Sequence, residues 1–240
     1  ASLSTITISA GSTTGTTTFN PTDDSIYEGS ETAIIAITGV SGGDATENAT
    51  QSETITITDN ESAPTVTLST SASSVAENGS DLTLTATLSV ATTADVTVTL
   101  AGTGTSTAEV DYASLSTITI AAGNTTGTTA FNPTDDSIYE GSETAIIAIT
   151  GVSGGSATES GTQSKTITIT DNESAPTVTL NTSASSVAEN GSNLTLTATL
   201  SGATSEDVTV TLTGTGTSTA GTDYASLSTI TIAAGNTTGT

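Results

Sequence analysis

The sequence predicts an all-β fold made of tandem seven-stranded antiparallel β-sandwiches, immunoglobulin-like and of Greek-key topology. Apolar and polar residues alternate strictly in segments such as 54–58, 82–85 and 96–100, which is the period of a half-buried strand. These segments are rich in β-branched Thr, Val and Ile, which favour the extended chain. Gly, Asn, Asp and Ser fill the gaps between them, as turns require, and no segment has a helical period.

Seven main strands are expected in one complete repeat. The alternating segments place them at about 65–69, 81–89, 95–101, 115–121, 126–131, 143–150 and 164–170. A short extended piece at Ser74–Ala76 is expected to pair beside the first of them. Short strands at this regular spacing favour an antiparallel sandwich.

The sequence repeats itself with an offset of 112 residues, since the segment that begins at Ala1 begins again at Ala113 and at Ala225. Residues 1–63 match 113–175 at all but seven positions, and residues 64–128 match 176–240 at all but eight. Solenoid repeats normally span about 20–50 residues, so this long repeat indicates whole domains instead.

The domain boundaries are expected at two junctions that share the sequence Asp-Asn-Glu-Ser-Ala-Pro, at 59–64 and 171–176. Each follows one alternating strand and precedes another, and Pro suits the first residue of a strand. The predicted division is therefore the C-terminal part of a repeat at 1–63, a complete repeat at 64–175 and the N-terminal part of the next at 176–240. Neither partial repeat has enough strands to close a core alone, so we expect the parent protein to be longer.

The net charge of −24 comes from 25 acidic residues and a single base, Lys165. Such a charge, with 33% apolar residues, is also typical of disorder, but the strict alternation contradicts that interpretation. The charge excludes nucleic acid and anionic membrane as partners and favours cations. No apolar run is long enough to insert into a membrane.

Catalysis is not expected. The chain has no His and no Cys, which removes the usual pairs of nucleophile and base. Paired carboxylates can hydrolyse glycosides, but such sites normally lie in aromatic-lined clefts, and aromatic residues are 2% of this chain. The few aromatic side chains, among them Tyr112, Phe131 and Tyr139, are expected in the cores.

One loop of the complete repeat has four carboxylates within nine residues, from Asp135 to Glu143, with no base nearby. These charges repel one another unless a cation lies among them. Ca²⁺ takes six to eight hard oxygen ligands from flexible loops, so it is the cation that this loop suits. A solvated acidic loop is the alternative, and the loop alone does not decide between them.

Four motifs together resemble the Calx-beta domain, the seven-stranded calcium-binding sandwich of sodium–calcium exchangers, integrin-associated proteins and large bacterial surface proteins. They lie in order at 74–79 (SVAENG), 107–112 (TAEVDY), 135–144 (DDSIYEGSET) and 168–173 (TITDNE). The resemblance covers 64–175 and implies that these loops gather at one end of the sandwich and bind Ca²⁺ there.

The resemblance also implies the candidate ligands. In the complete repeat they are Glu77, Asp111, Asp135, Asp136, Glu140, Glu143, Asp171 and Glu173. The partial repeats supply copies of some of them, namely Asp23, Asp24, Glu28, Glu31, Asp59, Glu61, Glu189 and Asp223. The last motif departs from the family, whose calcium-binding members often end in a run of Asp, because Asn172 offers an oxygen without a charge.

Asp171 and Glu173 directly precede Pro176, where the next sandwich is expected to begin. The calcium site is therefore predicted at the junction between repeats, where bound metal would stiffen the array into a rod.

The leading functional hypothesis is an extracellular, cell-surface segment: a stalk, fibre or adhesin extender of a large bacterial surface protein. Near-identical copies suit an extender, whose length changes with copy number. Its expected partners are calcium ions, neighbouring repeats of the same chain and other copies in a fibre. The alternative is an adhesive module that recognises a glycan or a partner protein, and a soluble calcium sensor is disfavoured because sensing does not need repeated copies.

Overall fold

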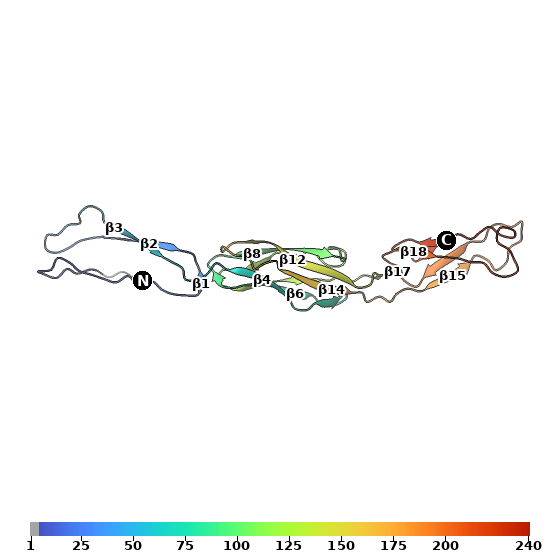
Figure 1. Ribbon diagram of the computed structural model, residues 1–240, viewed down its shortest axis with the longest axis horizontal. Coiled ribbons are helices and arrows are strands. Elements are labelled where there is room, and N and C mark those ends of the chain that lie inside the picture. The colour runs from blue at the N-terminus through green and yellow to red at the C-terminus, as the bar shows by residue number, and fades with distance from the viewer. Residues whose placement is uncertain (1–4) are drawn as a thin grey trace.

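A computed structural model describes residues 5–240, which form strands and loops without any helix. The all-β prediction is confirmed. No helix that could cross a membrane is found in this described part of the chain. The molecule is a long, thin rod with a closed middle section and an open section at each end (Figure 1).

The middle section, within residues 64–175, is built from two sheets. One has the order β10 (Thr126–Phe131), β6 (Leu82–Leu88), β4 (Thr65–Thr70) and β13 (Thr158–Glu159). The other has the order β5 (Ser74–Ala76), β14 (Ser164–Thr170), β12 (Glu143–Ser153), β8 (Val96–Gly104) and β9 (Ile118–Ile120). The longer strands pair antiparallel, whereas the short β5 and β13 pair in parallel at the sheet edges.

The prediction that the piece at Ser74–Ala76 pairs beside the first strand is wrong, because β5 pairs with β14 in the opposite sheet. The chain changes sheets just before β5. The Ser71 amide still donates to Thr83 of β6 at 2.9 Å, but the carbonyl of Ser73 already accepts from Thr168 of β14 at 2.9 Å. This crossing brings the residue after β5 next to the end of β14.

The core lies between the two sheets and consists mainly of Val, Leu, Ile and Ala. Burial alternates along β6, where Leu82, Leu84, Ala86 and Leu88 face inward. Each large aliphatic side chain buried in this way contributes about 1.5–3 kcal/mol. Tyr112 and Phe131 stack in the core with ring centroids 5.0 Å apart.

Gly102 on β8 makes room for the Tyr112 ring. A Cβ at position 102 would lie 2.2 Å from the Tyr112 hydroxyl oxygen and 3.1 Å from the ring carbon that carries it. The absence of a side chain there lets the ring enter the core. The buried Tyr112 ring thereby anchors the loop that carries Asp111, the residue directly before it.

The end sections are incomplete sandwiches. The N-terminal section has the hairpin of β2 (Glu31–Ala36) and β3 (Ser52–Ile57). The C-terminal section has a sheet of β15 (Val178–Thr182), β16 (Leu196–Leu200) and β20 (Thr238–Gly239), and a pair of β18 (Val208–Val210) and β19 (Ile230–Ile232). Its core comprises four buried residues, Ala198, Leu200, Ile230 and Ile232.

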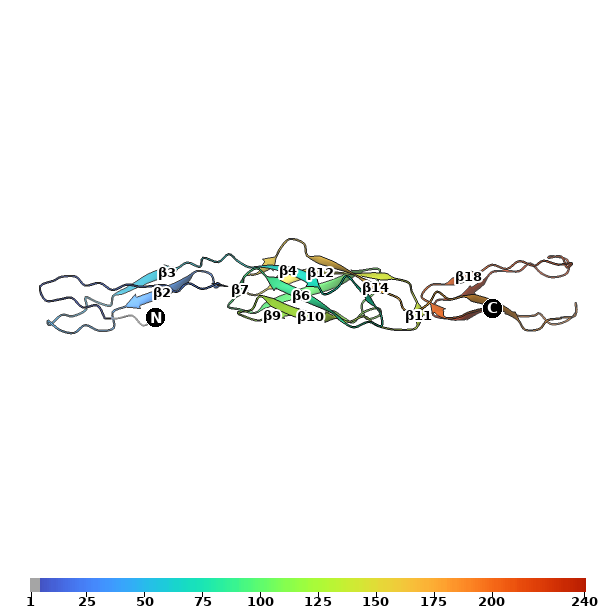
Figure 2. The same ribbon diagram turned by 90° about the horizontal axis from the view of Figure 1, so that it is seen from below.

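Neighbouring sections join through short parallel strand pairs. At the first junction β1 (Ile26–Tyr27) pairs with β7 (Ala91–Thr92), and at the second β11 (Ile138–Tyr139) pairs with β17 (Ala203–Thr204). The second strand pair repeats the first with an offset of 112 residues on both strands. Figure 2 shows β7 and β11 at opposite ends of the middle section. The prediction that Tyr139 belongs to a core is therefore wrong: it is half-buried at the junction, where its carbonyl accepts from Ser205 at 3.2 Å.

Candidate metal centre

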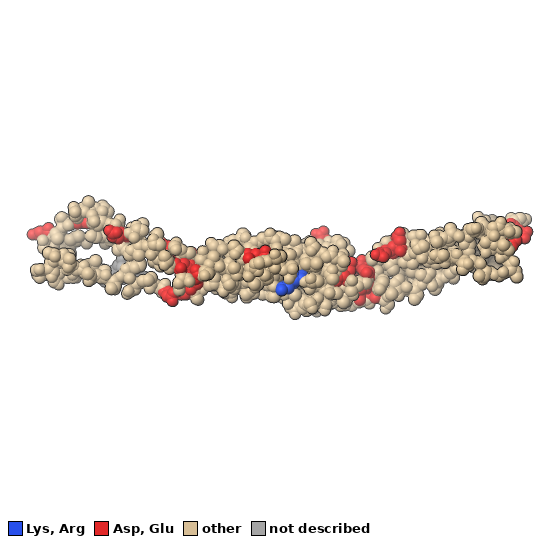
Figure 3. Space-filling model, in the orientation of Figure 1, with Lys and Arg blue, Asp and Glu red and all other residues tan. Residues whose placement is uncertain are grey.

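Acidic loops of the middle section meet at the end that faces the C-terminal section. Glu77 follows β5, Asp111 lies between β8 and β9, and the loop from Asp135 to Glu143 surrounds β11. Asp171 and Glu173 follow β14 and lead into the next section. Figure 3 shows acidic residues gathered where the sections meet.

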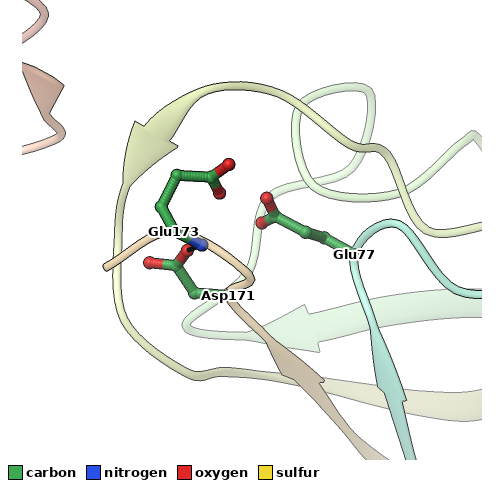
Figure 4. A group of neighbouring side chains, drawn as sticks. All are labelled: Glu77, Asp171 and Glu173. Carbon is green, nitrogen blue, oxygen red and sulfur yellow. Dashed lines mark hydrogen bonds between the residues drawn. The ribbon is translucent and has the colours of Figure 1, made fainter. Parts of the chain in front are cut away.

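The first cluster is formed by Glu77, Asp171 and Glu173. In Figure 4 the carboxylates of Glu77 and Glu173 point toward each other, and that of Asp171 lies beside the Glu173 backbone nitrogen. One oxygen from each lies within 4.8 Å of the others. The parallel pairing of β5 with β14 explains the approach, since Ala76 lies opposite Thr170 and both strands then end together. Glu77 is only 6% exposed. The Oε2 atom of Glu173 is buried and has no hydrogen-bond partner.

The second cluster is formed by Asp111, Glu140 and Glu143, again with one oxygen from each within 4.8 Å of the others. Asp111 is buried and held by its own loop: its amide donates to the Thr107 carbonyl at 2.9 Å, and its Oδ2 accepts from the Thr107 amide at 2.5 Å. The Oε2 atom of Glu143 is buried without a hydrogen-bond partner. Each cluster therefore contains one carboxylate oxygen that no group of the described chain satisfies.

Asp171 connects the two clusters. Its Oδ2 accepts from the amides of Glu140 at 2.7 Å and Gly141 at 2.6 Å, and its Oδ1 accepts from the amide of Glu173 at 2.7 Å. Burial raises the pKa of Asp171, but these three donors outweigh it and hold the pKa below its ordinary value. Gly141 has a φ of 76°, which glycine adopts without strain and which turns its amide toward Asp171.

The other buried carboxylates are destabilised in their charged form. Burial, followed by the neighbouring Glu173, Asp171 and Asp136, raises the pKa of Glu77 to about 8. Burial and the charge of Asp111 raise the pKa of Glu140 to about 7. Burial and the hydrogen bond with Asp111 raise the pKa of Glu143 to about 7. Burial and the neighbouring carboxylates disfavour the charged form of these groups, and a cation among them would favour it.

The geometry fits a hard divalent cation. Both clusters offer only carboxylate oxygens, which Ca²⁺ prefers over nitrogen or sulfur ligands. An unpartnered buried oxygen normally marks an unsatisfied group that an ion or water completes. The two unpartnered carboxylate oxygens, on Glu143 and Glu173, both belong to the clusters, so these are the positions where a cation would be held.

Two candidate ligands of the complete repeat lie outside both clusters. Asp136 is exposed, and its Oδ1 accepts from the Ile138 amide at 2.7 Å, so it shapes the start of β11. Asp135 is exposed and accepts from the side-chain amide of Asn172 at 3.3 Å. Both residues therefore form hydrogen bonds that shape the loop carrying Glu140 and Glu143. That any acid of this region is a metal ligand stays a prediction.

The described part of the N-terminal section has the same hydrogen bonds around its junction aspartate, but it has no complete acidic cluster. Asp59 accepts from the amides of Glu28 and Gly29, both at 2.6 Å, and from the amide of Glu61 at 3.0 Å, as Asp171 does with its own neighbours. The Glu61 amide, followed by the other two donors, lowers the pKa of Asp59 to about 2 against the effect of burial. No group of three acids as close as the two described above occurs there among residues 5–63.

The remaining candidates of the partial sections are spread out. Asp23 accepts from the side chain of Asn60 at 3.0 Å, Asp24 accepts from the Ile26 amide at 2.8 Å, and Glu31 begins β2. In the C-terminal section Asp223 accepts from the Thr219 amide at 2.7 Å, as Asp111 does from Thr107. Glu189, the copy of Glu77, is exposed.

Sequence reasoning missed the strand pair between sections. Ile138 and Tyr139 sit in the middle of the acidic loop and pair with Ala203 and Thr204. Thr204 is buried there, and its hydroxyl donates to the Glu206 carbonyl at 2.6 Å. A two-residue strand is too short for a periodic pattern; the available signal was a pair of large apolar residues inside an acidic loop.

Two domain families match different parts of the chain. The Calx-beta domain family matches residues 4–61 and 171–235, together just over half of the chain. The LapA domain family matches residues 63–173. A search of the curated proteins gave no match.

Two solved structures are similar in outline. A Calx CBD1 domain in its apo form has 17% identity and a TM-score of 0.39, over 45% of this chain and 99% of that one. CBD12 from CALX1.2 has 16% identity and a TM-score of 0.38, over 69% of this chain and 70% of that one.

The family match falls on the two end sections, whereas the middle section matches the LapA domain. The sections are near-copies of one another: residues 113–175 of the middle differ from residues 1–63 at only seven positions. Since the Calx-beta match covers the larger share of the chain, the chain belongs to the Calx-beta domain family.

Proposed function

We propose that this chain is a structural, non-enzymatic segment of an extracellular surface protein, in which Ca²⁺ bound by the acidic loops stiffens the junctions between repeats. The observation that carries the proposal is the position of β11. It pairs with β17 of the next section, and it lies in the same loop as Glu140 and Glu143 of the second cluster. The ion site and the junction are therefore built from the same few residues.

The ion would be held by Glu77, Asp171 and Glu173 in one cluster and by Asp111, Glu140 and Glu143 in the other. Binding would fix the loop around β11 against the body of the middle repeat. It would also fix Glu173, which belongs to the linker toward Pro176. Both connections to the next section are then attached to one rigid site.

Loss of the ion would loosen the junction for an electrostatic reason. Six carboxylates would remain within two small clusters, and no base lies nearby. Their mutual repulsion in a partly buried site favours opening of the loops. The strand pair of β11 with β17 is only two residues long, so it is too short to hold the junction without further support.

The extracellular, extender role is supported by the sequence as a whole. The seven-strand, 112-residue repeat with boundaries at 64 and 176 recurs with few changes, so copies can be added without altering the joints. The same junction pairing occurs twice in the structure, at β1 with β7 and at β11 with β17. A repeating joint of this kind suits a stalk or fibre that separates two functional ends.

Small-angle scattering with and without a chelator tests the stiffening. With Ca²⁺ the chain should scatter as a rod of fixed length, and chelation should shorten the mean end-to-end distance as the second junction bends. The Glu173→Gln variant should resemble the chelated chain even in Ca²⁺. Glu109→Gln is the matched control, because Glu109 is an exposed acid of the same section that belongs to neither cluster. An unchanged profile after chelation would reject the stiffening role.

A further inference from the structure

Asn172 lies between the two acids with which the linker to the next section begins, Asp171 and Glu173, and it has no charge of its own. Its side chain is exposed, yet the amide at its tip lies within hydrogen-bond distance of the buried Glu77. A neutral residue is thus placed where three acidic segments of the middle section meet, and its hydrogen bonds show what it does there.

The side-chain amide of Asn172 has two possible orientations, because a half-turn exchanges its nitrogen and its oxygen. In one, the nitrogen donates to Asp135 Oδ1 at 3.3 Å and to Glu173 Oε1 at 3.4 Å, but the oxygen then faces only other acceptors. In the other, the nitrogen donates to Glu77 Oε1 at 2.8 Å and to Asp135 Oδ1 at 3.2 Å, and the oxygen accepts from Asn78 Nδ2 at 3.3 Å. The second orientation is favoured, because it gives both polar atoms a partner.

In the favoured orientation the amide joins two carboxylates from different loops. Glu77 follows β5, and Asp135 precedes β11. Glu77 is only 6% exposed, so its charge is poorly hydrated and requires donors from the protein. An Asn side-chain nitrogen carries two hydrogens, which is one for each of the two carboxylates. The amide therefore supplies, without a charge, part of what a cation between them would supply.

The same link occurs at the first junction. Asn60 is the copy of Asn172, and Asp23 is the copy of Asp135. The side-chain nitrogen of Asn60 donates to Asp23 Oδ1 at 3.0 Å. The link between the linker Asn and the loop Asp is therefore a property of the repeat that both joints share.

We propose that the Asn172 amide takes the position of a cation between Glu77 and Asp135, so that this part of the junction is held by hydrogen bonds and takes no ion. A carboxylate at position 172 would face the same two acids with no hydrogen to donate. The three groups would repel one another, and a further divalent cation would be needed to hold them together. The residue at position 172 thus sets how many ions the junction binds.

This inference rests on the proposed function, since it specifies the ion count of the same site. The link and the first cluster use different oxygens. Glu77 has two carboxylate oxygens, so Oε1 accepts from Asn172 while Oε2 remains for the cluster with Asp171 and Glu173. The buried Oε2 of Glu173 has no partner in the structure, so the link leaves it for the ion.

Thermal unfolding of the full chain in a chelator tests the link without any metal. Asn172→Ala removes the donor, and Asn172→Asp removes it and adds repulsion. Because hydrogen bonds to charged acceptors are among the stronger ones, Asn172→Ala should lower the melting temperature of the middle section by about 5 °C, and Asn172→Asp by more. Asn124→Asp is the matched control, because it makes the same chemical change in the exposed loop between β9 and β10. It should leave the melting temperature unchanged.

Native mass spectrometry in a Ca²⁺ titration counts the ions. Asn172→Asp should bind a further Ca²⁺ ion relative to the unmodified chain, and saturating Ca²⁺ should restore its melting temperature. Asn172→Ala and Asn124→Asp should bind the same number of ions as the unmodified chain.

The two measurements separate this inference from the proposed function. An unmodified chain that binds no Ca²⁺ would reject the proposed function, while the melting temperatures in the chelator would still test the link. The inference would be overturned if Asn172→Asp melted with the control in the chelator, or if it bound no further ion while the unmodified chain binds Ca²⁺. Fewer ions in Asn172→Ala would also overturn it, since the amide oxygen would then be an ion ligand.

Discussion

The middle section and the N-terminal section have almost the same sequence over residues 113–175 and 1–63, but within the described part of the chain only the middle one forms close acidic clusters. The local bonds are present in both. Asp171 and Asp59 each accept three backbone amides from the same kind of loop. Glu143 meets Asp111, however, while the N-terminal section has no copy of Asp111 among its residues. The loops therefore order themselves locally, and the ion site requires both halves of the repeat.

The largest expected effect is on the core. Ile147→Ala removes a fully buried side chain of the middle section and should lower its free energy of unfolding by about 2–5 kcal/mol. Ile35→Ala makes the same change in the N-terminal section, where the side chain is half-buried. This substitution should lower the free energy of unfolding of the N-terminal section by less than about 1 kcal/mol, because substitutions outside a packed core have small effects. Urea unfolding followed by circular dichroism measures both, and equal losses would contradict the comparison.

Much of this fold could be predicted from the sequence because strand periodicity is a local signal. The strict alternation of 82–85 and 96–100 corresponds to β6 and β8. The partner of Ser74–Ala76 could not be predicted, since it depends on where the chain crosses between sheets. Junction strands such as Ile138–Tyr139 were missed because two residues have no period, and they pair with another repeat.

The acidic residues of the site could be identified from their motifs, but not their grouping. Asp135 and Asp136 are as acidic as their neighbours, yet they lie on the exposed side of the loop. Glu77 and Asp171 are far apart in sequence and meet only because β5 and β14 are parallel. Which acids lie close together depends on the tertiary fold, so it could not be predicted from the composition.

A smaller effect concerns pH in the absence of metal. The pKa of Glu77 is raised to about 8 in the folded chain, so the folded form binds this proton more tightly than the unfolded form does. Stability should therefore rise as the pH falls from about 8 toward the ordinary pKa of 4.5, and be lost again as the pH rises. At about 1.4 kcal/mol per pKa unit, the shift from 4.5 to about 8 sets an upper limit of about 5 kcal/mol on this gain.

Thermal unfolding in a chelator between pH 5.5 and 8 measures this gain. Glu77→Gln should flatten the profile, because the amide does not titrate, whereas Glu109→Gln should leave it unchanged. With Ca²⁺ the trend should weaken or reverse, since protons compete with the ion for the same carboxylates. A melting temperature that falls on acidification without metal would contradict the raised pKa of this cluster.

The most direct test of the calcium site is a calorimetric titration of Ca²⁺ into the chain, with thermal unfolding measured before and after. Saturable binding that is lost in Glu143→Gln and Glu173→Gln is the predicted result. An ion bound only by the folded state, at about 100 times its Kd, adds about 2.7 kcal/mol, so the melting temperature should rise by about 10 °C or more. No binding heat and no change in melting temperature would show that the clusters are solvated acids, and that the junctions are not held by calcium.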